Sequence, residues 1–233
     1  MGPNGPSHDW LHVHRVRLTA LSLSDCPSLT SPINRLVLEL AALFHDLCDS
    51  KYLSQSAASG PVTAKAVLAK FMEPLLSGGV LDDKQVQCIY HIVDSTSWSK
   101  EEKRRAANVG DDDEARWQKG CPEFQCVSDA DRLDAIGSFG TLRVAAFSGA
   151  RNRALHVPGL GIDDEASRRT SAVQHFHDKS VCRTPYSRDC RSYSNFGHHR
   201  LFRIKGDRLW TKMARTEADR RQTMVTVTAL LIP

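Results

Sequence analysis

Side chains that bind metal ions stand at three separate places in the sequence: His12, the pair His45-Asp46, and the string Asp129-Ala130-Asp131. Imidazole nitrogens and carboxylate oxygens are the donors that hard or borderline divalent ions take in proteins. Helices that converge in a bundle direct such side chains inward from different turns. These residues therefore predict a site for one divalent ion, although they are far apart along the chain.

The pair His45-Asp46 is the most informative of these groups because it ends the apolar stretch at residues 36–44. Two polar groups at this place would lie at the rim of a hydrophobic core. Burying them there costs free energy unless an ion or a polar partner compensates. Their position favours a binding role.

The elements that must position these residues are predicted to be helices. Apolar residues repeat at three- to four-residue spacing in eight stretches, which indicates an all-α fold. The stretches are residues 10–23, 33–47, 62–76, 82–93, 124–136, 142–147, 165–179 and 209–231. The second is preceded by Ser31-Pro32, a favoured helix start. Residues 225–231 are rich in β-branched side chains, but they end a helical pattern and are predicted to be helical.

Residues 99–120 are predicted to be a solvated loop. A basic run at 103–105 is followed by an acidic run at 111–114, without an apolar stripe between them. Opposite charge blocks of this kind are typical of exposed segments.

Composition limits the class of protein. A chain of 233 residues with 41% hydrophobic residues is long enough for one sizeable core, so a single domain is expected. The net charge is +4, without the basic and aromatic stripe that a nucleic-acid polymer requires. No apolar run or leader pattern predicts a membrane span or secretion. An odd count of seven scattered cysteines favours a reducing, intracellular compartment, and we expect a cytoplasmic protein.

Three motifs resemble the HD superfamily of metal-dependent phosphohydrolases in order and spacing. They are H-x-x-R-V beginning at His12, A-A-L-x-H-D ending at Asp46, and D-A-D-R-L-D-A-I-G at residues 129–137. The resemblance is greatest to the small bacterial and fungal HD phosphohydrolases that include nucleotide pyrophosphatases. It implies a single helical bundle over residues 1–233, with a core at 7–180 and 201–231 and loops or insertions at 99–120 and 181–200. The second insertion interrupts the resemblance, and it is expected either to loop out or to disrupt the last helices.

The resemblance also implies the ligands of the ion. Two histidines and two aspartates bind it in the family, which here are His12, His45, Asp46 and Asp131, with Asp129 as the alternative for the fourth. Manganese or magnesium is the expected ion. Iron, cobalt and nickel suit the same donors.

The reaction that the resemblance implies is hydrolysis of a phosphate ester or anhydride. The expected substrate is a nucleoside triphosphate, cleaved to the monophosphate and pyrophosphate or with release of phosphate. Asp46 and Asp49 are the predicted catalytic carboxylates, although Asp49 could equally be a solvated group at a helix end. The predicted phosphate ligands are Lys51, Arg132 and Arg143, for which ordinary ion pairs are the alternative.

Other functions stay open at this point. The partner expected is a small phosphorylated molecule, with no nucleic-acid polymer and no membrane, and a homodimer is one of the open oligomeric states. An HD-fold hydratase or lyase acting on a non-phosphate molecule is an alternative, as is a catalytically silent binding module. A zinc module built on the cysteines is disfavoured, since their spacings match no common finger.

Overall fold

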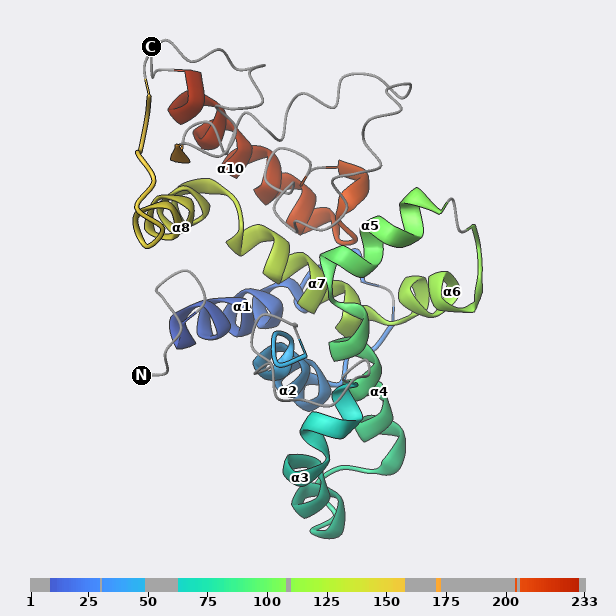
Figure 1. The fold of residues 1–233 in the computed structure, drawn as a ribbon. Coiled ribbons are helices and arrows are strands. Elements are labelled where there is room, and N and C mark those ends of the chain that lie inside the picture. Colours follow the sequence, from blue (N-terminus) through green and yellow to red (C-terminus); the bar gives the residue numbers. More distant parts are fainter. Residues whose placement is uncertain are drawn as a thin grey trace. The chain divides into compact units, whose positions relative to one another are not determined.

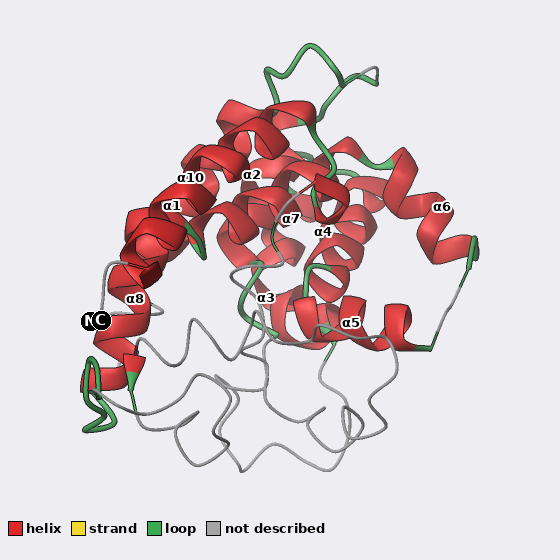
Figure 2. Ribbon diagram, turned by 90° about the horizontal axis from the view of Figure 1, so that it is seen from above, coloured by secondary structure: helices red, strands yellow, loops and turns green. Residues whose placement is uncertain are grey.

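The computed structural model describes residues 9–29, 31–48, 63–107, 110–157, 171–172, 204 and 206–230. The chain divides into two compact units, which we call the central unit (residues 13–130) and the terminal unit (residues 1–12 and 131–233). The regular structure of the described residues is helical, and it contains no β-strand (Figure 2). The expected all-α fold is thereby confirmed, while the expectation of a single domain stays a prediction.

Helices α2 (Arg35–Phe44), α3 (Ala64–Ser77) and α4 (Asp83–Ser95) form the core of the central unit, where α4 packs against both of the others (Figure 1). Leu38, Leu68 and Ile89 are fully buried there, one from each helix. Side-chain caps define where these helices begin. The side-chain oxygen Oδ1 of Asn34 accepts from the backbone N–H groups of two residues of α2, each at 3.1 Å, so this helix begins two residues after the predicted start.

The starts of α3 and α4 are encoded in the same way. Asp82 and Gln85 make a reciprocal capping box at the start of α4. Thr63 caps α3 through the backbone N–H of its third residue at 3.3 Å. These local hydrogen bonds explain why the predicted ranges 62–76 and 82–93 match α3 and α4 closely.

The prediction of a loop at residues 99–120 is wrong for its described part. Helices α5 (Trp98–Ala106) and α6 (Asp113–Gly120) occupy it. The two charge blocks pair with one another, because Arg104 donates to the Asp112 carboxylate at 2.6 Å. The same carboxylate caps α6 by accepting from the Ala115 N–H at 2.8 Å. The Arg104 hydrogen bond and this cap lower the pKa of Asp112 to about 2.

The terminal unit contains α8 (Gly137–Gly149), the short 3-10 helix at Gly206–Arg208 and α10 (Lys212–Leu230), with α8 and α10 packed together (Figure 1). Gly137 begins α8 at a φ of +73°, and a Cβ there would lie 3.1 Å from the Arg221 side chain. A glycine is therefore required both for the turn and for the approach of α10. Residues 225–230 are helical, as predicted.

Two further helices, α1 (Trp10–Leu23) and α7 (Pro122–Asp134), each begin in one unit and end in the other. The range predicted for α1 is the observed one. The helix predicted at 165–179 and the insertion predicted at 181–200 lie outside the described residues. Among the residues that are described, no helix is both long enough and apolar enough to cross a membrane.

Candidate metal centre

His12 is held in a single orientation within the terminal unit. It lies in the first turn of α1, where its backbone N–H donates to the Asp9 carboxylate at 3.1 Å, and the residue is only 1% exposed. Its ring Nδ1 lies 2.7 Å from Asp134 Oδ2. Because an ionised carboxylate only accepts, Nδ1 donates to Asp134, and in the neutral ring Nε2 is then the nitrogen that can bind an ion.

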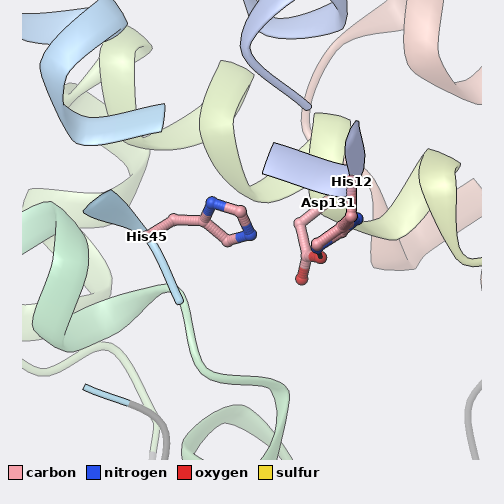
Figure 3. Close-up of side chains that lie close together, drawn as sticks. All are labelled: His12, His45 and Asp131. Carbon is pink, nitrogen blue, oxygen red and sulfur yellow. Dashed lines mark ion pairs between the residues drawn. The ribbon is translucent and has the colours of Figure 1, made fainter. Parts of the chain in front are cut away.

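Asp131 lies on the Nε2 side of that ring. Its Oδ1 is 3.6 Å from His12 Nε2, and the two side chains point toward one another (Figure 3). This separation is too long for a hydrogen bond. It suits two ligands of one ion, since donor atoms that each lie about 2.0–2.2 Å from a common metal are roughly 3 Å or more apart. The Asp131 side chain is 22% exposed, so one side of the pair is accessible.

Asp134 is fixed in turn by Arg143 of α8. The Arg143 guanidinium donates to Asp134 Oδ2 at 2.9 Å, and the two side chains are 15% and 6% exposed. This partly buried guanidinium holds the Asp134 carboxylate against His12. Metal-binding histidines are commonly oriented by such a carboxylate on the second ring nitrogen. The sequence analysis assigned no role to Asp134, although its place one helical turn after Asp131 is a usable signal.

His45 and Asp46 follow α2 directly in the central unit. The Nδ1–H of His45 donates to the Ala42 carbonyl at 2.8 Å, and the residue is 5% exposed. A carbonyl cannot donate, so Nδ1 carries a proton, and in the neutral ring Nε2 is the nitrogen that can bind an ion. Nε2 lies 3.6 Å from Asp46 Oδ1, whose side chain is 25% exposed, which repeats the spacing of the pair in the terminal unit. Figure 3 draws the His45 side chain.

The other predicted site residues have varied surroundings. Asp49 and Lys51 lie outside the described residues. Arg132 is 7% exposed and donates to the Arg208 carbonyl in the terminal unit, and Arg143 pairs with Asp134 as described above. Their predicted contacts with phosphate stay predictions. Asp129 is fully buried and contributes to the raised pKa of Cys126 one turn away, whereas Asp131 faces His12.

Comparisons with known proteins place this arrangement in a known fold. No protein-family model matches the chain. The curated proteins include a relative, the uncharacterized protein YpgQ of Bacillus subtilis, which is 29% identical over 172 residues, or 74% of this chain and 67% of YpgQ. A crystal structure of YpgQ matches with a TM-score of 0.58 at 26% identity, covering 95% of this chain and 86% of that one.

An HD-superfamily hydrolase from Bacillus thuringiensis matches with a TM-score of 0.52 at 23% identity, over 95% of this chain and 82% of that one. This chain has the HD fold. A protein of Lactobacillus plantarum matches it with a TM-score of 0.58 at 20% identity, over 98% of this chain and 86% of that one. The fold that the three motifs predicted is thereby confirmed, and each unit carries an imidazole and a carboxylate of the kind that bind metal ions.

Proposed function

We propose that this HD-fold protein is a metal-dependent phosphohydrolase that binds one divalent ion through His12, His45, Asp46 and Asp131. The observation that carries the proposal is the buried His12 ring, whose Nε2 faces Asp131 at 3.6 Å while its Nδ1 is taken by Asp134. A histidine whose Nδ1 is held by one carboxylate and whose Nε2 faces a second carboxylate has the surroundings of a metal ligand.

The chemistry of the donors fits the proposed ion. His12, His45 and Asp131 each offer one ligand atom of a kind that binds metal, and Asp46 adds a second carboxylate. Two imidazoles with two carboxylates suit Mn²⁺, and Mg²⁺, Fe²⁺, Co²⁺ and Ni²⁺ are the alternatives. An ion in such a site lowers the pKa of water and withdraws electron density from a phosphoryl group.

The chain's own residues hold the reacting groups in this proposal. Asp134, which Arg143 holds, orients the His12 ring, and the Ala42 carbonyl orients the His45 ring, so that each Nε2 would be available to the ion. Asp46 orients the attacking water and is the candidate to take its proton. Asp49, Lys51, Arg132 and Arg143 keep their predicted roles, the first in proton transfer and the other three in neutralising phosphate charge.

A nucleotide is the proposed substrate. One solved structure of YpgQ is a complex with ADP, and it matches this chain with a TM-score of 0.54 at 23% identity. That complex supports a binding site for a nucleoside phosphate in this branch of the fold. We propose cleavage of a nucleoside triphosphate to the monophosphate and pyrophosphate, with phosphate release as the alternative. A reducing compartment such as the cytoplasm suits the five described cysteines, which are all free.

The proposal is tested by measuring phosphate and pyrophosphate release from a panel of nucleotides with added Mn²⁺. We compare the intact chain with Asp46→Ala and with Asp219→Ala, a matched control in which an exposed aspartate of α10 is removed. Activity in the intact chain and the control but not in Asp46→Ala is expected. Folded, metal-loaded protein without activity on any nucleotide would overturn the proposal and favour a non-phosphate substrate or a silent binding module.

A further inference from the structure

An arginine of α10 reaches the last turn of α7. The Nη1 of Arg221 donates to the backbone carbonyl of Leu133 at 2.6 Å. The last carbonyl groups of a helix have no partner within its regular ladder and need donors from elsewhere. The Leu133 carbonyl also accepts from the N–H of Ile136, at 3.3 Å. Arg221 therefore adds a second, shorter hydrogen bond that holds the end of α7.

Two carboxylates make this helix end electrostatically unfavourable. Asp131 and Asp134 both lie in the last turn of α7, where the partial charge of a helix is negative. Cations are stabilising at such a place. Arg143 approaches it from α8 and donates to Asp134 Oδ2 at 2.9 Å, while Arg221 approaches it from α10. Two guanidinium groups thus oppose the two carboxylates and the negative end of α7.

We propose that Arg221 is a positioning residue of the proposed metal centre, where it sets the last turn of α7 and with it the carboxylates of Asp131 and Asp134. The inference rests on the proposed function. Asp131 Oδ1 lies 3.6 Å from His12 Nε2, and Asp134 Oδ2 lies 2.7 Å from His12 Nδ1. Arg221 binds the backbone of Leu133, which stands between the two aspartates in the sequence. A shift of this turn would move both carboxylates relative to the ring at once.

Glu217, one turn earlier on α10, fixes the Arg221 guanidinium. Arg221 Nε donates to Glu217 Oε1 at 2.6 Å, and Arg220 binds the same carboxylate through two hydrogen bonds of 2.8 Å. These bonds lower the pKa of Glu217 to about 2, so it is ionised at neutral pH. The Arg221 side chain is 25% exposed and that of Arg220 is 69% exposed. Arg220 is therefore a matched control that shares Glu217.

The apolar stem of Arg221 makes a separate contact. A Cβ at Gly137 would lie 3.1 Å from both Cβ and Cγ of Arg221, so the stem lies directly over the residue that begins α8. This contact is part of the packing of α10 against α8 (Figure 1). Methionine keeps an unbranched apolar stem without a charge, and lysine keeps such a stem with a cation and donors. The two substitutions separate packing from charge.

The experiment compares the intact chain with Arg221→Met, Arg221→Lys and the control Arg220→Met. Amide hydrogen exchange is measured first, without metal, at Ala135 and Ile136, whose N–H groups donate back to the last turn of α7 at 3.2 and 3.3 Å. We expect these two amides to exchange several-fold faster in Arg221→Met. Rates close to those of the intact chain are expected in Arg221→Lys and in Arg220→Met.

Calorimetric titration with Mn²⁺ follows on the same proteins. The affinity of Arg221→Met is expected to be roughly 3- to 10-fold weaker, below the 10- to 100-fold loss typical of a group that contacts the ligand itself. Arg221→Lys should recover most of this loss, and Arg220→Met should bind as the intact chain does. Equal losses in Arg221→Met and Arg221→Lys would mean that only the stem matters, which would overturn the inference.

The remaining outcomes are also decisive. Unchanged exchange in folded Arg221→Met would overturn the inference, as would faster exchange with unchanged Mn²⁺ affinity. If Arg221→Met does not fold, Glu217→Ala releases Arg221 without removing it, and exchange at Ala135 and Ile136 no faster than in Arg220→Met counts against the inference. An intact chain that binds no Mn²⁺ would refute the proposed function, while exchange without metal would still decide whether Arg221 holds the end of α7.

Discussion

Replacing Asp134 with asparagine isolates what the carboxylate does for His12. The substitution preserves size but removes the charge that accepts from His12 Nδ1 at 2.7 Å and from Arg143 at 2.9 Å. An amide oxygen accepts more weakly than a carboxylate, and an amide nitrogen turned toward the ring would favour the wrong tautomer. Loss of such a supporting group typically lowers metal affinity 10- to 100-fold. This corresponds to about 1.4–2.7 kcal/mol.

The three side chains are almost buried, with exposed fractions of 1% for His12, 6% for Asp134 and 15% for Arg143, so solvent screens their interactions little. The variant also leaves Arg143 facing a neutral group. We expect the free energy of unfolding without metal to fall by roughly 1–3 kcal/mol. This loss must be separated from the loss of affinity.

The assay is calorimetric titration of Mn²⁺ into the intact chain, Asp134→Asn and the exposed control Asp219→Asn, each after a thermal melt without metal. A 10- to 100-fold weaker Mn²⁺ affinity in folded Asp134→Asn, with the control unchanged, is expected. Unchanged Mn²⁺ affinity in a folded Asp134→Asn variant would refute the argument that the carboxylate prepares His12 as a ligand.

Three further outcomes follow from the structure. Mn²⁺ at 100 times its Kd should stabilise the intact chain by about 2.7 kcal/mol but not Asp46→Ala, as melts with and without a chelator would show. Leu68→Ala should cost about 2–5 kcal/mol in chemical denaturation because Leu68 is fully buried, whereas Leu76→Ala, at a residue that is 37% exposed, should cost under about 1 kcal/mol. The Arg220 and Arg221 hydrogen bonds lower the pKa of Glu217 from 4.5 to about 2, so its contribution is present above pH 4.5 and is lost as the pH falls toward 2. The stability difference between the intact chain and Glu217→Gln should shrink over that interval in denaturation curves, and a constant difference would contradict it.

Local sequence signals predicted most of the described helices. The range of α1 was predicted in full, and α3 and α4 differ from their predicted ranges by no more than two residues at either end. Apolar periodicity and the polar caps act within a few neighbouring residues, so one sequence is enough to read them. The segment 99–120 was predicted wrongly because its helices depend on a partner eight residues away, the Arg104–Asp112 pair, and not on an apolar stripe.

The sequence by itself determined the all-α class, the resemblance to the HD superfamily and the donor types of the proposed site, because these follow from periodicity, motif order and side-chain chemistry. It did not determine the role of Asp134, which is 122 residues from His12 along the chain. Only the tertiary structure decided that Asp134 lies against His12 and that Arg143 holds Asp134 there. Such pairings depend on how distant helices pack, and packing brings together side chains whose spacing in the sequence carries no period.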